Sequence, residues 1–240
     1  MFPPLILLAN SDLLFHRGAG EERFVASWRE YAVTPLRCAA YLGASNGDMA
    51  EFYDLFVAAT SPLSLEERRH VKAEPAGDDL TFLDRADLLL LAGGDVQRGL
   101  RAFEASGVRQ KIVDAYLRGA LVVGVSAGAV QLGSAGHEEP PSSNGSDTAV
   151  QDTEPLCEPL PGFRFLPFVV GVHDAPEWSG LRRAVRRQGE GTRGIGIPAG
   201  GGAIFHRDGS LEPVRHPLVE LLAKADGAMT ETLLFPPGTT

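Results

Sequence analysis

Residues 124–128, Gly124-Val125-Ser126-Ala127-Gly128, place a serine between two glycines directly after an apolar run. This fits the G-x-S-x-G pattern of a nucleophile elbow, which presents a serine on a sharp turn between a strand and a helix. Side chains at positions 124 and 128 would clash in so tight a turn, which explains the glycines. The alternative is a plain strand-to-helix turn made of small residues. Because a strand-like run precedes Ser126 and a helix-compatible run follows it, we predict that Ser126 is a nucleophile.

A serine that attacks an acyl carbon needs a base to accept its proton. Of the six histidines, His173 is the best placed, because it follows the apolar run FVVGV at 168–172. The carboxyl ends of parallel strands form the edge at which open α/β sheets bind ligands, so His173 and Ser126 are expected at one edge. The alternative is a strand-end histidine that is hydrogen-bonded to a nearby carbonyl.

A third residue, which would orient the imidazole, is expected from the loop at 133–162, a segment rich in Pro, Gly, Ser and acidic residues. We favour Asp152, although most of the acids in this loop are expected to be ordinary solvated charges. The residues alone leave the choice open among Glu138, Glu139, Asp147, Asp152 and Glu154.

Paired glycines end another apolar run, at Gly93-Gly94, and Asp95 follows them. Asp95 is a natural cap for the helix that starts there, and it is also a candidate for substrate binding. The bare backbone N–H groups of Gly93 or Gly94 could face the same edge as Ser126. Together with the N–H of Ala127, they would form an oxyanion hole.

Short apolar segments alternate with amphipathic ones, which is typical of a parallel sheet covered by helices on both faces. We therefore predict a single doubly wound α/β domain over residues 1–240, with a late β-hairpin at Asp208-Gly209. The expected strands are 5–9, 37–43, 87–94, 121–125, 168–172, 194–197 and 203–205. The expected helices are 21–32, 49–59, 64–70, 95–118, 178–188 and 217–224, of which 49–59 has its apolar residues at helical spacing and 64–70 starts with a capping box.

The composition excludes several classes of partner. With 22 basic and 31 acidic residues the net charge is −9, which disfavours nucleic acid and anionic membranes. The early apolar run PPLILLA is too short to span a bilayer and lacks the charged start of a signal peptide, so we expect a cytoplasmic protein. Two distant cysteines, Cys38 and Cys157, make a disulfide framework or a cysteine zinc site unexpected. The sequence is compatible with a homodimer.

Four segments, in this order, resemble the serine peptidases that include aspartyl dipeptidase (dipeptidase E) and cyanophycinase. They are AYLGASNGDMAEFYDLF (40–56), LLLLAGGDVQRGL (88–100), ALVVGVSAGAVQLG (120–133) and GFRFLPFVVGVHD (162–174), and GIGIPAGGGAIF resembles the late strand pair of the family. The resemblance implies a class I glutamine amidotransferase-like α/β fold. It implies Ser126 as nucleophile, His173 as base, and an oxyanion hole near Gly94 and at Ala127. The implied activity is hydrolysis of small peptides or a peptide-like polymer, often at aspartyl linkages, without a metal ion or cofactor.

The chain also departs from this family. Pro198 and Ala199 stand where cyanophycinases carry an acidic pair, and arginine returns after the histidine only at Arg182 and Arg183, so cyanophycin is not the expected substrate. Arg182 is the candidate cation for substrate binding.

Two other functions compete with a peptidase. An esterase of the α/β-hydrolase fold is disfavoured, because a single loop and strand separate Ser126 from His173. A non-catalytic relative that binds a small molecule or partner in the same pocket is the other alternative.

Overall fold

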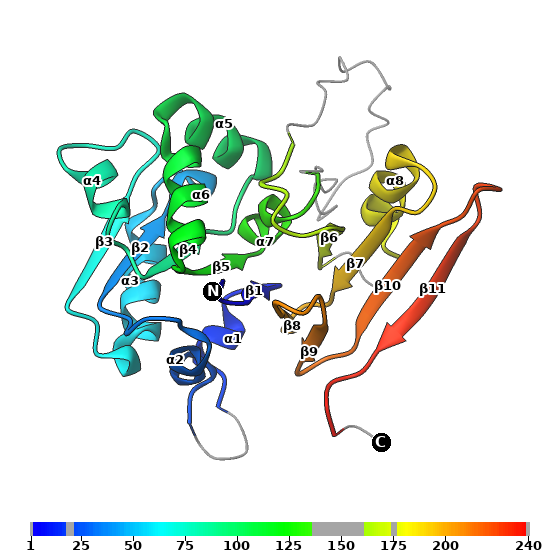
Figure 1. Cartoon of the computed structure of the whole chain (residues 1–240), viewed down its shortest axis with the longest axis horizontal. Coiled ribbons are helices and arrows are strands. Elements are labelled where there is room, and N and C mark those ends of the chain that lie inside the picture. The colour runs from blue at the N-terminus through cyan, green and yellow to red at the C-terminus, as the bar shows by residue number, and fades with distance from the viewer. Residues whose placement is uncertain (1, 18–21, 136–160, 174–176, 239–240) are drawn as a thin grey trace, which may run out of the picture.

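The computed structural model describes residues 2–17, 22–135, 161–173 and 177–238 (Figure 1). The five acidic candidates for the third catalytic residue, Asp152 among them, lie outside the described residues. The strands are β1 (Leu5–Leu8), β2 (Cys38–Leu42), β3 (Glu67–Val71), β4 (Leu88–Leu91), β5 (Leu121–Val125), β6 (Val169–Val172), β7 (Arg193–Ile197), β8 (Gly202–Phe205), β9 (Leu211–Val214), β10 (Leu218–Ala223) and β11 (Met229–Leu234). The α-helices are α1 (Asp12–Phe15), α2 (Trp28–Tyr31), α3 (Ala50–Ala59), α4 (Asp79–Leu83), α5 (Val96–Ser106), α6 (Val108–Arg118), α7 (Ala127–Leu132) and α8 (Ser179–Gln188), and the 3-10 helices are η1 (Phe24–Ser27), η2 (Ala44–Asn46) and η3 (Ser61–Leu63).

The larger sheet has seven strands in the order β3-β2-β4-β5-β1-β8-β9. The first five of these pair in parallel, whereas β8 and β9 pair antiparallel. The turn between β8 and β9 contains Asp208-Gly209, with Gly209 at φ 86°. The predicted mostly parallel sheet with helices on both faces and a late hairpin is therefore confirmed.

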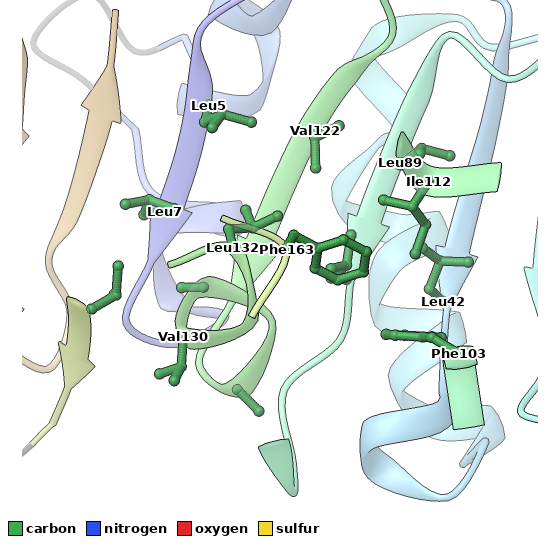
Figure 2. Close-up of a cluster of buried hydrophobic side chains, with 14 of the residues drawn as sticks. Leu5, Leu7, Leu42, Leu89, Phe103, Ile112, Val122, Val130, Leu132 and Phe163 are labelled. Carbon is green, nitrogen blue, oxygen red and sulfur yellow. The ribbon is translucent and has the colours of Figure 1, made fainter. Parts of the chain in front are cut away.

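Alternating residues of the same strands pack on opposite faces of this sheet, as the strand period requires. Leu5 and Leu7 belong to a cluster that includes residues of α5, α6 and α7, part of which Figure 2 shows. Ile6 and Leu8 belong to a second cluster, which includes Trp28 and residues of α1, α2 and α3. Both faces of β1, β2, β4 and β5 are thus buried, so these four strands are continuous apolar runs rather than alternating ones.

A second sheet has four strands in the order β11-β10-β7-β6, and β10 and β11 form its long hairpin in Figure 1. One of its faces packs on α8 through Trp178, Leu181 and Val185. Gly194 and Gly196 of β7 are needed there, because a methyl group at either would lie within 2.7 Å of a side chain of α8 or of its N-cap, Trp178. The segments 168–172 and 194–197 are strands as predicted, but the sequence did not indicate that they form a separate sheet.

Two predicted helices are wrong. The segment 64–70 is mostly strand β3, because Ser64 takes a left-handed conformation (φ 52°) and the chain then pairs in parallel with β2. The segment 217–224 is strand β10, whose odd-numbered residues Val219, Leu221 and Ala223 are buried against α8. The helix expected over 21–32 is two short elements, η1 and α2.

Candidate active site

Ser126 lies on the sharp turn between β5 and α7. Its backbone angles, φ 50° and ψ −114°, fall in a region that residues with a side chain rarely occupy. The Ser126 N–H donates a 2.8 Å hydrogen bond to the carbonyl of Leu8, so the turn is tied to the neighbouring strand β1. A strained residue at the end of a buried strand is typical of a functional position, because ordinary packing would select glycine there.

The glycines on either side of Ser126 are required by packing. A methyl group on Gly124 would lie 2.6 Å from the backbone nitrogen of Ala129 in α7. A methyl group on Gly128 would lie 2.2 Å from the carbonyl oxygen of Leu91 in β4. Helix α7 therefore approaches the two central strands closely enough that only glycine fits at either position.

A cavity of about 500 Å³ opens at the carboxyl ends of four neighbouring strands of the larger sheet and of β6 in the second sheet. Ser126 and His173 both line it. Its other lining residues follow β1 (Asn10, Ser11, Leu14), β2 (Ser45, Asn46) and β4 (Ala92, Gly93, Gly94, Asp95, Arg98), belong to the sheet (Tyr41, Leu90, Val125) or come from α3 and its N-cap (Met49, Phe52, Leu55, Phe56). The site is where ligands bind in open α/β sheets.

His173 directly follows β6 at the rim of this cavity. Its backbone N–H donates to the carbonyl of Ile197, and its ring is hydrogen-bonded to the backbone of Ala9 at the end of β1. Desolvation of the ring lowers the pKa of His173 below its usual value, although the bond to Ala9 and the charge of Asp12 both act to raise it. The imidazole is therefore neutral at pH 7, as a general base must be.

The segment that follows β4 presents unpaired backbone donors beside Ser126. The N–H of Ala92 donates to Leu42 and that of Asp95 donates to Ser45, whereas those of Gly93 and Gly94 have no partner among the described residues. A methyl group on Gly93 would lie 3.2 Å from the Cβ of Ser126. The N–H of Ala127 also has no acceptor in the part of the chain that the structure describes, because it lies in the first turn of α7.

The two charged residues predicted to bind substrate lie in different places. Asp95 lines the cavity and also caps α5, since its carboxylate accepts a 2.7 Å hydrogen bond from the N–H of Arg98. Arg182 lies on α8, where its guanidinium pairs with Glu231 of β11 and donates to the carbonyl of Glu177. Arg182 is not among the residues that line the cavity, so the structure does not bring it to the site.

Two features of the site were missed in the sequence. Arg98 lines the cavity, and it lies one helical turn after Asp95, a spacing that could have suggested it. Gln131 is completely buried and donates from Nε2 to the Ser45 hydroxyl and to the carbonyl of Val96, 3.0 Å each. It thereby connects the helix after Ser126 to η2, which follows β2, and to the start of α5, which follows β4.

A family model, that of peptidase family S51, matches residues 38–212. The chain belongs to peptidase family S51. The S51 match covers the segments that contain Gly94, Ser126 and His173. No curated protein matches this S51 chain.

Two solved structures resemble the S51 chain along nearly its whole length. A peptidase from an acI-B1 Actinobacterium has 16% identity and a TM-score of 0.70, over 99% of this chain and 96% of the other. A putative peptidase E protein from Listeria monocytogenes EGD-e has 14% identity and a TM-score of 0.56, over 98% of this chain and all of the other. At these identities the likeness shows a shared fold.

In the described part of the chain, no helix is both long and apolar enough to cross a membrane.

Proposed function

We propose that this chain is a serine peptidase in which Ser126 is the nucleophile and His173 the general base. The Ser126 oxygen attacks the carbonyl carbon of the scissile bond while His173 takes its proton. The N–H groups of Gly94 and Ala127 hold the oxyanion. The C–N bond then breaks, the leaving amine takes the proton from His173, and water releases the acyl group by the same steps in reverse.

One observation carries this proposal: Ser126, in a strained backbone conformation, and His173, whose pKa is lowered by burial, line one cavity. Gly93 lies beside this serine and Gly94 follows it, and neither N–H has an acceptor among the described residues, which supports the oxyanion hole. The S51 membership supports serine peptidase chemistry in general.

We further propose a small peptide substrate, with an aspartyl residue as the first candidate, in the cytoplasm. Support for a substrate carboxylate comes from Arg98, a cation on the cavity wall whose guanidinium has no ion-pair partner among the described residues. An aspartyl side chain or a free C-terminus could pair with it.

A fluorophosphonate probe tests the proposal, because it labels only activated serines. We expect stoichiometric labelling at Ser126, no labelling of Ser126→Ala, and loss of dipeptide hydrolysis in the same variant. Ser126→Ala retains a Cβ in the same backbone conformation, so its unfolding midpoint serves as the control for folding. Dipeptide hydrolysis that persists at the wild-type rate in Ser126→Ala would refute the proposal.

One observation favours a second function, that of a non-catalytic binding protein. The partner of the His173 ring among the described residues is the backbone of Ala9 rather than a carboxylate. Within the described ranges, no carboxylate is hydrogen-bonded to this ring, whereas a triad needs such an anion to stabilise the imidazolium. Failure of a folded sample to react with the probe would favour this function.

A further inference from the structure

The cavity wall formed by α3 and its N-cap is apolar and exposed. Met49, Phe52 and Leu55 all line the cavity beside Ser126, yet 47%, 41% and 40% of their respective surfaces remain accessible to water. They are three residues apart on one side of α3, and we call them the α3 wall. Large apolar side chains that stay exposed around a cavity are typical of a ligand site, because a ligand removes them from water.

The deeper surface of the cavity is apolar too. Phe56 and Leu90 are buried and line it behind the α3 wall, and Leu14 lines it from α1. A volume of about 500 Å³ is large enough for an aromatic side chain together with the peptide unit that must reach Ser126.

The polar groups on this side of the cavity are already engaged within the protein. The Asn46 amide donates to the Tyr41 hydroxyl at 2.6 Å and accepts from the N–H of Met49. Burial raises the pKa of Tyr41 to about 12, so its hydroxyl stays neutral. The Ser45 hydroxyl accepts from Gln131. A polar substrate side chain placed here would compete with these internal hydrogen bonds, whereas an apolar one would gain by burial.

We propose that the substrate carries a large apolar side chain, such as that of Phe, Leu or Met, next to the scissile bond, and that this side chain packs on the α3 wall. The inference rests on the proposed function, because Ser126 defines where the scissile bond lies. It adds a requirement that the pairing of a carboxylate with Arg98 does not supply. Among substrates that carry a carboxylate for Arg98, those with a larger apolar side chain are expected to be cleaved faster.

A dipeptide matrix tests the proposal, with Phe, Leu, Met, Ala, Ser and Asp at each of the two positions. At one position, a large apolar residue should raise kcat/KM about 10- to 100-fold over Ala or Ser, the range expected for burying such a side chain. Equal rates for Phe, Ala and Ser at both positions would overturn the inference. So would a protein that reacts with the fluorophosphonate probe at Ser126 but cleaves none of the apolar dipeptides. In both cases probe labelling would still support the proposed function, so the two failures are distinguishable.

A matched pair of variants on α3 locates the preference. Phe52→Arg places a charge in the α3 wall, whereas Val57→Arg places the same charge on an exposed residue of α3 that does not line the cavity. Phe52→Arg should lower kcat/KM for the apolar dipeptides about 10- to 100-fold relative to kcat/KM for the Ala and Ser dipeptides. Val57→Arg should change kcat/KM for the apolar dipeptides, and for the Ala and Ser dipeptides, less than about twofold. An apolar preference that survives in Phe52→Arg would show that the α3 wall does not hold the side chain.

Discussion

Replacement of Gly94 by alanine tests whether the segment after β4 is held in place beside Ser126. Gly94 has φ 124°, which an alanine tolerates only at a cost of about 1–3 kcal/mol. Its added methyl group would also lie 2.2 Å from the carbonyl oxygen of Ser45, so one backbone segment must move by about 1 Å to restore ordinary contact. Overpacking of this kind costs about 1–3 kcal/mol more.

The movement has a catalytic consequence if the N–H of Gly94 holds the oxyanion. Loss of one such donor lowers the rate by about 10²–10³-fold. Gly107→Ala is the matched control, because Gly107 also has positive φ (76°) but nothing lies within 4 Å of the added methyl group. Gly107→Ala should therefore lose only about 1–2 kcal/mol and keep its reaction rate.

Urea unfolding measures the two free energies, and the rate of fluorophosphonate labelling under native conditions measures the site. We expect Gly94→Ala to lose about 1–3 kcal/mol more than Gly107→Ala, and to react at least 100-fold more slowly. Equal stability losses would refute the packing argument. A Gly94→Ala protein that reacts at the wild-type rate would refute the role of this segment in the oxyanion hole.

Three further predictions concern the nucleophile, the base and Gln131, which connects the helix after Ser126 to η2 and α5. Ser126→Gly should relieve the backbone strain and raise the free energy of unfolding by about 1–2 kcal/mol over Ser126→Ala in urea titrations, and an unstabilised glycine variant would contradict the strain. Because the pKa of His173 is lowered in the folded protein, the labelling rate should begin to fall only below pH 6.5, and in Asp12→Asn it should fall at a still lower pH. The contribution of His173 to the free energy of unfolding should be constant above pH 6.5. It should decrease as the pH drops below 6.5, since protonation of the ring favours the unfolded chain. Gln131→Leu should lower the free energy of unfolding by about 1–3 kcal/mol in the same urea titrations and slow labelling, because it leaves the Ser45 hydroxyl and the Val96 carbonyl without their donor. Wild-type stability in this variant would show that the connection is unimportant.

The parallel sheet and the turn at Ser126 could be predicted from the sequence because both depend on local pattern. Buried parallel strands are continuous apolar runs, and the elbow needs glycine at two fixed positions, 124 and 128. The strand at 67–71 was missed because it lies at the sheet edge, where Glu67 and Arg68 remain partly exposed and the run is polar. At 218–223, the spacing of the apolar residues in so short a run fits a helix and a strand equally well. Only the contact with α8 selects the strand.

The cavity itself could not be predicted from the sequence. The helical spacing of Met49, Phe52 and Phe56 indicated one apolar side of a helix, but it cannot distinguish a side buried in the core from one that lines a pocket. In the structure Phe56 belongs to the core while Met49 and Phe52 remain exposed. Arg182 was predicted to bind substrate because it follows the histidine in sequence, but it does not line the cavity. Its guanidinium pairs instead with Glu231, on a strand about fifty positions later.

The hydrogen bonds between α7 and the segment before β6 bear on how this chain tolerates insertions. The N–H groups of Phe163 and Leu166 donate to the carbonyls of Gln131 and Leu132, and that of Ser134 donates to Phe168. The chain thus leaves α7 and returns to the same place before it continues through β6 to His173. The length of the sequence between 135 and 161 is therefore decoupled from the separation of Ser126 and His173. Insertions or deletions in that segment are therefore expected to leave the nucleophile and the base at the same spacing.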